Sequence, residues 1–156
     1  SMDVKNLAKK GHAFTSNKDT NILSTLDTNS IIQTDYLTVT PNENLTKLVD
    51  LISHSNQVIF AVVDDENRLL GIVHFNDIRE IIFNTYRVKY TLVKEIMTEP
   101  ADIIYPDDSM ELVMNKFEKS RKAFLPVLKN DKYFGFISKS VALEAYRTKL
   151  RSMTIE

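Results

Sequence analysis

"GIVHFNDIREIIF" (71–83) recurs in altered form 64 residues later as "GFISKSVALEAYR" (135–147). Each stretch opens with one of the three glycines of the chain, continues as a short apolar run, and reaches a polar group ahead of a helical pattern. An apolar run that gives way to helical spacing is typical of a strand followed by a helix. The recurrence predicts that the chain contains two copies of one structural unit.

A second matched pair lies upstream of the first in each copy. "TVTPNENLTKLVDLI" (38–52) aligns with "IIYPDDSMELVMNKF" (103–117), 65 residues later. In both stretches apolar residues recur with the i, i+3, i+4, i+7 spacing of one face of an amphipathic helix. Asn44 and Ser109 precede these faces at equivalent positions, where a side-chain oxygen can accept a hydrogen bond from a free first-turn amide. We therefore expect helices to start near Asn44 and Ser109.

Between these matches, each copy has two apolar runs on either side of a polar turn. The turns read "DDENR" (64–68) and "KNDK" (129–132), and the pattern is typical of a hairpin. Each unit therefore reads strand, helix, strand, strand, helix. One unit of roughly 55–60 residues buries too little apolar surface to be stable alone. We predict an α+β (α/β) fold in which two β-α-β-β-α repeats pack with pseudo-two-fold symmetry.

Composition excludes several classes of protein. The apolar fraction of 43% and the charged fraction of 26% are ordinary for a globular domain. A net charge of −1 argues against a nucleic-acid partner, which usually requires a basic face. The chain has no cysteine, so it can form neither a disulfide nor a thiolate metal site. No apolar window approaches the ~18 residues of a membrane span.

No catalytic constellation is visible in the sequence. There is no Ser-His-Asp pattern in a strained turn, no Gly-rich phosphate loop and no His/Asp metal cluster. The carboxylates at 64–66 and 107–108 fall in a turn and at a helix start, where they are explained as solvated or capping residues. We therefore expect no catalytic residue, no metal site and no enzymatic activity.

The ordered set of motifs resembles a tandem pair of CBS domains. In the first copy the resemblance rests on Pro41 and on residues 62–64 and 71–77. In the second copy it rests on "VKEIMTEPADIIYP" (93–106), Pro126-Val127, and residues 135–141. The resemblance implies a first CBS domain over 30–87 and a second over 88–150. Residues 1–29 would then be a tag remnant, suggested by Ser1-Met2, followed by a connector, and the chain would be a fragment of a longer protein.

A narrower resemblance concerns the connector. "NLAKKGHAFTSNKDTNILSTL" (6–26), leading into a CBS pair, is similar to the cytoplasmic linker that follows the last membrane helix of bacterial chloride channels or transporters of the CLC family. The resemblance implies a position on the cytoplasmic side of the cell membrane and a membrane-embedded channel portion in the same parent chain. The resemblance to CBS pairs, which associate through such helices, implies a homodimer formed through the helices that follow Asp77 and Ser140.

CBS pairs commonly bind adenine nucleotides in clefts between their repeats, so the resemblance implies AMP, ADP or ATP as a ligand, with no cofactor required. The residue types agree with this chemistry. An Asp at a helix start can accept hydrogen bonds from ribose hydroxyls. A Ser or Thr three residues earlier can contact phosphate, which the helix N-terminus also favours.

Two sets of candidate binding residues follow from the resemblance. The first set is His74, Asn76, Asp77, Pro100, Ala101, Asp102, Ala123 and Phe124. The second set is Asp35, Tyr36, Leu37, Val58, Ile59, Ser138, Lys139 and Ser140. The first set has the ribose carboxylate but a histidine in place of the hydroxyl, whereas the second has two hydroxyls but Val141 in place of the carboxylate. We rank the first set above the second for adenosine binding.

Other interpretations of these residues stay open at this point. Asp77 can serve only to stabilise a helix start, and Ser138 and Ser140 can serve only to bond local amides. The chain is then a structural dimerisation module with inactive ligand sites. A CBS pair can also regulate a different transporter or an enzyme.

Overall fold

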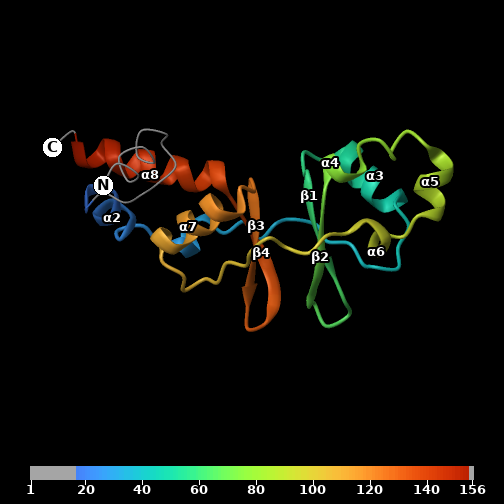
Figure 1. Ribbon diagram of the computed structural model, residues 1–156, viewed down its shortest axis with the longest axis horizontal. Helices are drawn as coiled ribbons and strands as arrows, with labels where there is room; N and C mark the ends of the chain where they lie inside the picture. Colours follow the sequence, from blue (N-terminus) through green and yellow to red (C-terminus); the bar gives the residue numbers. More distant parts are fainter. Residues whose placement is uncertain (1–16, 155–156) are drawn as a thin grey trace. The chain divides into compact units, whose positions relative to one another are not determined.

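The computed structural model describes residues 17–154, and its sheets are two hairpins, one in each repeat (Figure 1). β1 (Ile59–Val63) pairs antiparallel with β2 (Leu69–His74), and β3 (Phe124–Lys129) pairs with β4 (Lys132–Ser138). The predicted mixed fold of helices and strands, with one hairpin in each of the two repeats, is confirmed.

Helices precede and follow both hairpins. The helix ahead of each hairpin is α3 (Thr46–His54) in the first repeat and α7 (Met110–Ser120) in the second. The remaining helical elements are α2 (Asn17–Leu23), the 3-10 helix η1 (Thr28–Ile31), α4 (Phe75–Ile78), α5 (Thr85–Tyr90), α6 (Val93–Ile96) and α8 (Lys139–Thr154). Over the described residues, no helix combines the length and apolar character needed to cross a membrane.

The first predicted strand of each repeat is reduced to a single bridge, and the two bridges are equivalent. Val39 pairs in parallel with Val62, and Ile104 pairs in parallel with Val127, which are the same positions 65 residues later. The Val39 amide donates to Ala61 O at 3.0 Å and the Ile104 amide donates to Pro126 O at 2.9 Å. The internal repeat read from the sequence is therefore present in the backbone pairing.

Tertiary contacts divide the described chain into two compact units that do not coincide with the repeats. Unit 1 comprises residues 17–33, 101–127 and 136–154, and unit 2 comprises residues 34–100 and 128–135. The opening segment of each repeat pairs with the last strand of the other copy: Gln33 bridges Phe136 in unit 1, and Thr98 bridges Ile72 in unit 2. The pseudo-two-fold packing of the two repeats stays a prediction.

The core of unit 2 lies between its helices and the β1–β2 hairpin. Its fully buried members are Val39, Leu45, Leu48, Phe60, Val62, Val73, Ile78 and Val93. Gly71 leaves room for the Met97 side chain where the segment after α6 crosses β2, because a Cβ at this position would lie 2.8 Å from the Met97 Sδ. The same crossing forms the Ile72–Thr98 bridge.

The core of unit 1 includes the described part of the expected connector. α2 contacts both α7 and α8, and η1 contacts α8 (Figure 1). Ile22 and Leu23 of α2 are completely buried with Val113 and Phe117 of α7. Residues 17–31 are thus an integral part of unit 1, whereas residues 1–16 of the expected connector lie outside the described residues.

Ser109 caps α7 as predicted: its Oγ accepts a hydrogen bond from the Leu112 amide at 3.1 Å. The Asn44 Oδ1 accepts from the Thr46 amide at 3.1 Å, but α3 begins only at Thr46, after Leu45. The first helix therefore starts one residue later than its counterpart.

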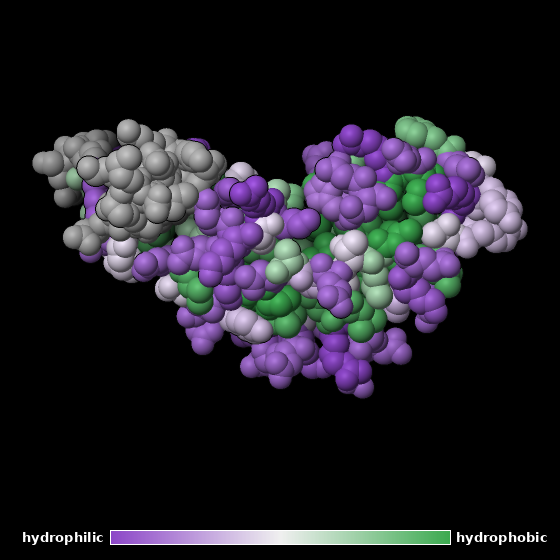
Figure 2. Space-filling model, viewed as in Figure 1, coloured by the Kyte–Doolittle hydropathy of each residue, from purple (hydrophilic) through white to green (hydrophobic). Residues whose placement is uncertain are grey.

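The helix expected after Asp77 is interrupted. α4 ends at Ile78, and α5 starts anew at Thr85, where Asn84 caps it by accepting from the Arg87 amide at 3.1 Å. Ile78 and Ile81 are buried in the core of unit 2, so they are not available for association. The exposed apolar groups near α5 are Phe83, Tyr86 and Tyr90, and Figure 2 shows hydrophobic residues at the surface of this region, bordered by hydrophilic ones.

Candidate nucleotide-binding residues

The first polar group, His74 to Asp77, forms the capped start of α4. His74 Nδ1 accepts a hydrogen bond from the Asn76 amide, and Asp77 Oδ2 accepts one from the His74 amide, both at 3.0 Å. This reciprocal arrangement is a capping box. His74 is the last residue of β2 and has an extended backbone conformation. The capping box fixes the orientation of the Asp77 carboxylate at the start of α4.

One oxygen of Asp77 stays available for a ligand. Asp77 is exposed, and its Oδ1 accepts no hydrogen bond from the residues that the structure describes. A ribose hydroxyl that donates to this oxygen would form a charge-assisted bond without disturbing the cap. The carboxylate can therefore serve the helix and a ligand at the same time, with one oxygen for each.

The second polar group, Ser138 to Val141, caps α8 in a related way. The Val141 amide donates to Ser138 Oγ at 3.0 Å, and the hydroxyls of Ser138 and Ser140 lie 3.0 Å apart. Ser138 is buried, whereas Ser140 is exposed. The apolar side chain of Val141 cannot accept a hydrogen bond from the Ser138 amide. Only one of the two hydrogen bonds of a capping box is therefore present at the start of α8.

In unit 2, part of the second set forms an apolar surface next to the start of β1. The Gln57 side chain connects the Leu37 segment to the start of β1. Its Oε1 accepts a hydrogen bond from the Leu37 amide at 3.0 Å, and its Nε2 donates to Leu37 O and Ile59 O, each at 2.8 Å. Leu37 is 51% exposed and Val58 is 37% exposed. Apolar side chains in this position can contact the face of a base, as in other ligand sites.

Two tyrosines and a carboxylate gather near this surface in unit 2. Burial raises the pKa of Tyr36, and the Asp35 carboxylate raises that pKa further. Burial also raises the pKa of Tyr133 strongly, with smaller contributions from Tyr36 and Asp35. A phenol with an ordinary pKa is already protonated at neutral pH, and the raised pKa values extend the protonated, hydrogen-bond-donating form of both tyrosines further into the alkaline range. Tyr133 belongs with this part of the second set.

In unit 1, the corresponding part of the first set is less apolar. Ala101 and Asp102 stand where the first repeat has Tyr36 and Leu37, and Ala123 stands where it has Val58. The Asp102 Oδ1 accepts a hydrogen bond from the Ile103 amide at 2.8 Å. Ala123 is placed by its carbonyl, which accepts from the Lys139 amide at 2.8 Å and thus lies beside the start of α8.

Each unit holds part of each set. Unit 2 contains His74, Asn76, Asp77 and Pro100 of the first set together with Asp35, Tyr36, Leu37, Val58 and Ile59 of the second. Unit 1 contains Ala101, Asp102, Ala123 and Phe124 of the first set together with Ser138, Lys139 and Ser140 of the second. Within unit 2, Val58 lies next to the α4 cap, because its carbonyl accepts from the Phe75 amide at 2.7 Å. That each complete set forms one site stays a prediction.

Two residues of these surfaces were missed by the sequence reasoning. Gln57 aligns with Lys122 in the second repeat, so the repeat comparison gave no reason to select it. Tyr133 lies on β4, in a run whose apolar residues indicate a core strand, and nothing in the run indicates contact with residues near Asp35. Among residues 17–154, no group of three or more His, Cys, Asp or Glu side chains is arranged to hold a metal ion.

Comparison with known proteins identifies the repeats. The family model described as "CBS domain" matches residues 29–84 and 93–147. The CBS domain of a bacterial CNNM/CorC family Mg2+ transporter, whose structure was solved in complex with ATP, superposes with a TM-score of 0.72 at 11% identity, over 82% of this chain and 92% of that one. At this identity the likeness establishes the fold alone.

Two enzymes contain a related segment. A homoserine O-acetyltransferase of Methanococcus vannielii is 27% identical over 110 residues, which are 70% of this chain and 22% of the enzyme. An inosine-5'-monophosphate dehydrogenase of Bifidobacterium longum is 37% identical over 90 residues, which are 55% of this chain and 16% of the enzyme. The chain thus spans about a fifth of the length of these relatives. Since the family model covers most of the sequence in two copies, the chain belongs to the CBS domain family.

Proposed function

We propose that this chain is a non-catalytic regulatory module that senses an adenine nucleotide, acts as a homodimer and forms the cytoplasmic CBS pair of a CLC-family chloride channel or transporter. Membership of the CBS family supports the regulatory role. The relative with the same fold that binds ATP supports a nucleotide ligand. The resemblance of residues 6–26 to a CLC linker supports the membrane parent and the cytoplasmic side.

The first set of candidate residues is the proposed adenosine site. The main support for this proposal is the geometry of the Asp77 carboxylate. The capping box fixes the carboxylate through Oδ2 and leaves Oδ1 for a ribose hydroxyl. The second set, with Ser138 and Ser140 but no carboxylate, is the weaker proposed site. AMP, ADP and ATP share the ribose, so all three are candidate ligands.

Calorimetric titration with AMP and ATP tests this site. Asp77→Ala should weaken binding by at least ~10-fold, the effect of one lost charge-assisted hydrogen bond. Glu95→Ala is the matched control, because Glu95 makes the same kind of capping contact at α6 by accepting from the Leu92 amide at 2.6 Å. Equal affinities of the two variants for nucleotide would contradict the proposed ribose contact.

A second candidate function is a structural dimerisation module. The observation that favours it is that His74, Asp77 and Ser138 all take part in helix caps, which accounts for these residues without a ligand. Wild-type protein that dimerises but releases no heat with millimolar AMP, ADP or ATP would establish this function instead.

The channel parent needs a test of its own, because CBS segments also occur in the two enzymes described above. Chloride flux through the parent chain in liposomes should change when ATP is added on the side of the CBS pair. The Asp77→Ala parent should lose this response and keep its basal flux. A parent without chloride transport would exclude the CLC assignment and leave the nucleotide site untouched.

A further inference from the structure

The side chain of Gln57 lies between two backbone segments of unit 2 that would otherwise pair directly. Val39 pairs with β1 through its amide, which donates to Ala61 O at 3.0 Å. Leu37 lies two residues earlier in the same segment, so its N–H and C=O face the same way as those of Val39. A continued ladder would join the Leu37 amide to Ile59 O. The Gln57 carboxamide bonds to both of these groups instead.

The carboxamide satisfies the two segments with one acceptor and one amino group. Its Oε1 accepts from the Leu37 amide, and the two protons of its Nε2 are donated to Leu37 O and Ile59 O. The side chains of Leu37 and Val58 are exposed beside this position. The gap between the segments therefore fits a planar group in which an amino nitrogen is next to an acceptor, and an apolar surface lies next to the gap.

Adenine presents the same arrangement along one edge. Its N6 amino group carries two protons, and the neighbouring ring nitrogen is an acceptor. In place of the carboxamide, the amino group would donate to Leu37 O and Ile59 O, and the ring nitrogen would accept from the Leu37 amide. The apolar side chains of Leu37 and Val58 would then contact the base. The hydrogen-bonding groups of the gap thus match the base, but Gln57 already uses them.

We propose that Gln57 is an internal competitor for the base of a nucleotide at the unit 2 part of the second set, and that its carboxamide has to leave before adenine binds there. The inference rests on the adenine-nucleotide ligand of the proposed function and adds a residue that lowers the affinity. Binding exchanges three hydrogen bonds of Gln57 for three hydrogen bonds of the base, so these bonds contribute little net affinity.

The first set has no such competitor at the equivalent position. Asp102 and Lys122 are the residues equivalent to Leu37 and Gln57. A lysine side chain has three donors and no acceptor, so Lys122 cannot accept a hydrogen bond from the Asp102 amide. Competition at the second set alone lowers its affinity relative to the first, in addition to the effect of Val141 in place of a carboxylate.

Removal of the carboxamide tests the competition. AMP is titrated calorimetrically into the full chain in the Asp77→Ala background, in which the proposed ribose contact of the first set is absent. Gln57→Ala should tighten AMP binding about tenfold, because the base no longer displaces the side-chain hydrogen bonds. Asn56→Ala, which removes the carboxamide of the exposed neighbouring residue, should leave the affinity unchanged. Unchanged or weaker binding by Gln57→Ala would show that Gln57 only supports the backbone, and would overturn the proposal.

A modified base tests the match of hydrogen bonds. N6,N6-dimethyl-AMP keeps the ring nitrogen but has no amino proton, so it cannot replace the donors of Gln57. Gln57→Ala should therefore gain about tenfold in affinity for AMP and much less for the dimethylated nucleotide. Equal gains for the two nucleotides would show that Gln57 only occupies space, and would overturn the match with the adenine edge.

The position of the Gln57 side chain gives a readout that is independent of affinity. The chain has only two glutamines, Gln33 and Gln57, so isotope labelling of glutamine side-chain amides gives two pairs of NH2 signals in an NMR spectrum. AMP should move the Gln57 pair to the position of a solvent-exposed carboxamide and leave the Gln33 pair in place. Gln57 signals that stay unchanged at saturating AMP would overturn the proposal.

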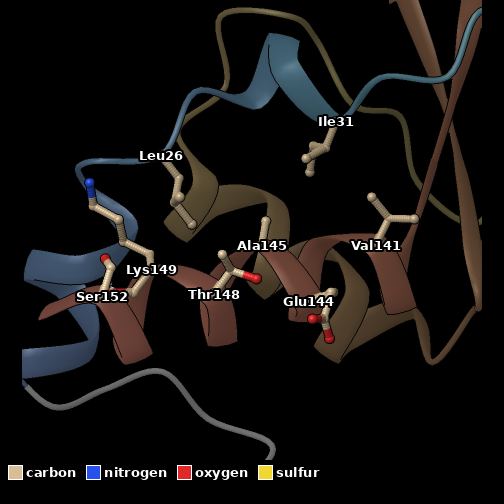
Figure 3. Close-up of a pocket in the computed structure, with 8 residues that line it drawn as sticks. All are labelled: Leu26, Ile31, Val141, Glu144, Ala145, Thr148, Lys149 and Ser152. Carbon is tan, nitrogen blue, oxygen red and sulfur yellow. Dashed lines mark hydrogen bonds between the residues drawn. The ribbon is translucent and has the colours of Figure 1, made fainter. Parts of the chain in front are cut away.

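A groove in unit 1 is the alternative place for the base. It has a volume of about 460 Å³, runs along α8 and has a mostly apolar lining (Figure 3). Leu26 and Ile31 point toward α8 from one wall, and Ala145 and Thr148 belong to the other. AMP-induced shifts of the Ala145 and Thr148 amides, without a change at the Gln57 side chain, would place the base in this groove and overturn the proposal.

Failure of this inference and failure of the proposed function give different results. AMP binding that is weakened by Asp77→Ala but is the same with and without Gln57→Ala overturns the competitor and retains the proposed nucleotide site. No binding of millimolar AMP by the wild type or by Gln57→Ala overturns both. Tighter binding by Gln57→Ala in the Asp77→Ala background, together with movement of the Gln57 signals, is the expected result.

Discussion

Gln33 and Phe136 pair with each other through both of their backbone hydrogen bonds, although they belong to different repeats. The Gln33 amide donates to Phe136 O at 2.8 Å, and the Phe136 amide donates to Gln33 O at 3.0 Å. Thr98 and Ile72 make the reciprocal pair, with distances of 2.9 and 2.8 Å. The opening segment of each repeat thus extends the hairpin of the other repeat, and each compact unit is assembled from both halves of the sequence.

This exchange predicts that the first repeat does not fold alone. A fragment of residues 30–87 lacks Val93, which is completely buried in the core of unit 2, and Thr98, which pairs with β2. We expect its amide resonances to show the narrow dispersion of an unfolded chain, whereas the full chain gives a dispersed spectrum. A dispersed, cooperatively melting fragment would contradict the prediction.

Gly71 and Met97 should be energetically coupled. Gly71→Ala places a methyl group 2.8 Å from the Met97 Sδ and should lower the free energy of unfolding by about 1–3 kcal/mol, a typical effect of overpacking. In the Met97→Ala background the same change should cost less, because the side chain that it meets has been removed. A double-mutant cycle by urea denaturation measures this coupling. Leu70→Ala, at the neighbouring exposed position, should be additive with Met97→Ala.

The Lys116–Asp108 ion pair should matter more for stability than the ion pair made by Glu43, the equivalent carboxylate of the first repeat. Lys116 Nζ donates to Asp108 Oδ2 at 2.7 Å and to Ile103 O at 2.6 Å, and the two side chains are only 14% and 11% exposed. Lys116→Met leaves a largely buried carboxylate without its cation and should cost about 2–4 kcal/mol.

The matched control is Lys47→Met. Glu43 is the residue equivalent to Asp108, but its contact with Lys47 is 3.7 Å long and the lysine side chain is 52% exposed. Exposed pairs of this kind contribute under about 1 kcal/mol. Equal losses in the two variants, measured as free energies of unfolding in urea, would show that burial does not distinguish the pairs.

The repeat and the caps were predictable from the sequence because their signals are local. Ser109 precedes an apolar face with helical spacing, and the predicted cap and helix start follow directly from that pattern. The two-copy architecture was predictable because equivalent residues, such as Val39 and Ile104, occupy equivalent sequence positions. The interruption after Ile78 was missed, since the capping tendency of Asn84 was outweighed by the apolar run around it.

The exchanged pairs and parts of the candidate surfaces were not predictable because their causes are not local. Gln33 and Thr98 form single bridges, which leave no alternating strand pattern in the sequence. Gln57 acts through Leu37, twenty residues away, and its equivalent in the other repeat is a lysine. A role of Asp77 at the helix start was one of the two interpretations open from the sequence, and its contact with the His74 amide agrees with it, whereas the ribose contact stays a prediction.

Tyr146 should make the stability of unit 1 sensitive to alkaline pH. Burial, followed by a hydrogen bond from its hydroxyl to Asp19 Oδ1, raises the pKa of Tyr146 to about 12, compared with about 10 in an unfolded chain. Because the raised pKa reflects a favoured neutral phenol, the contribution of Tyr146 to stability is complete below pH 10 and is lost as the pH rises to about 12. The contact joins α2 to α8, so its loss should loosen α2 first.

The tyrosinate absorbance of wild-type protein should contain a transition near pH 12 that is absent in Tyr146→Phe and unchanged in Tyr90→Phe, whose ring is 60% exposed. Asp19→Asn should lower this pKa only in part, since burial is the larger cause. A transition unaffected by Tyr146→Phe would assign it to another phenol and contradict the predicted link between α2 and α8.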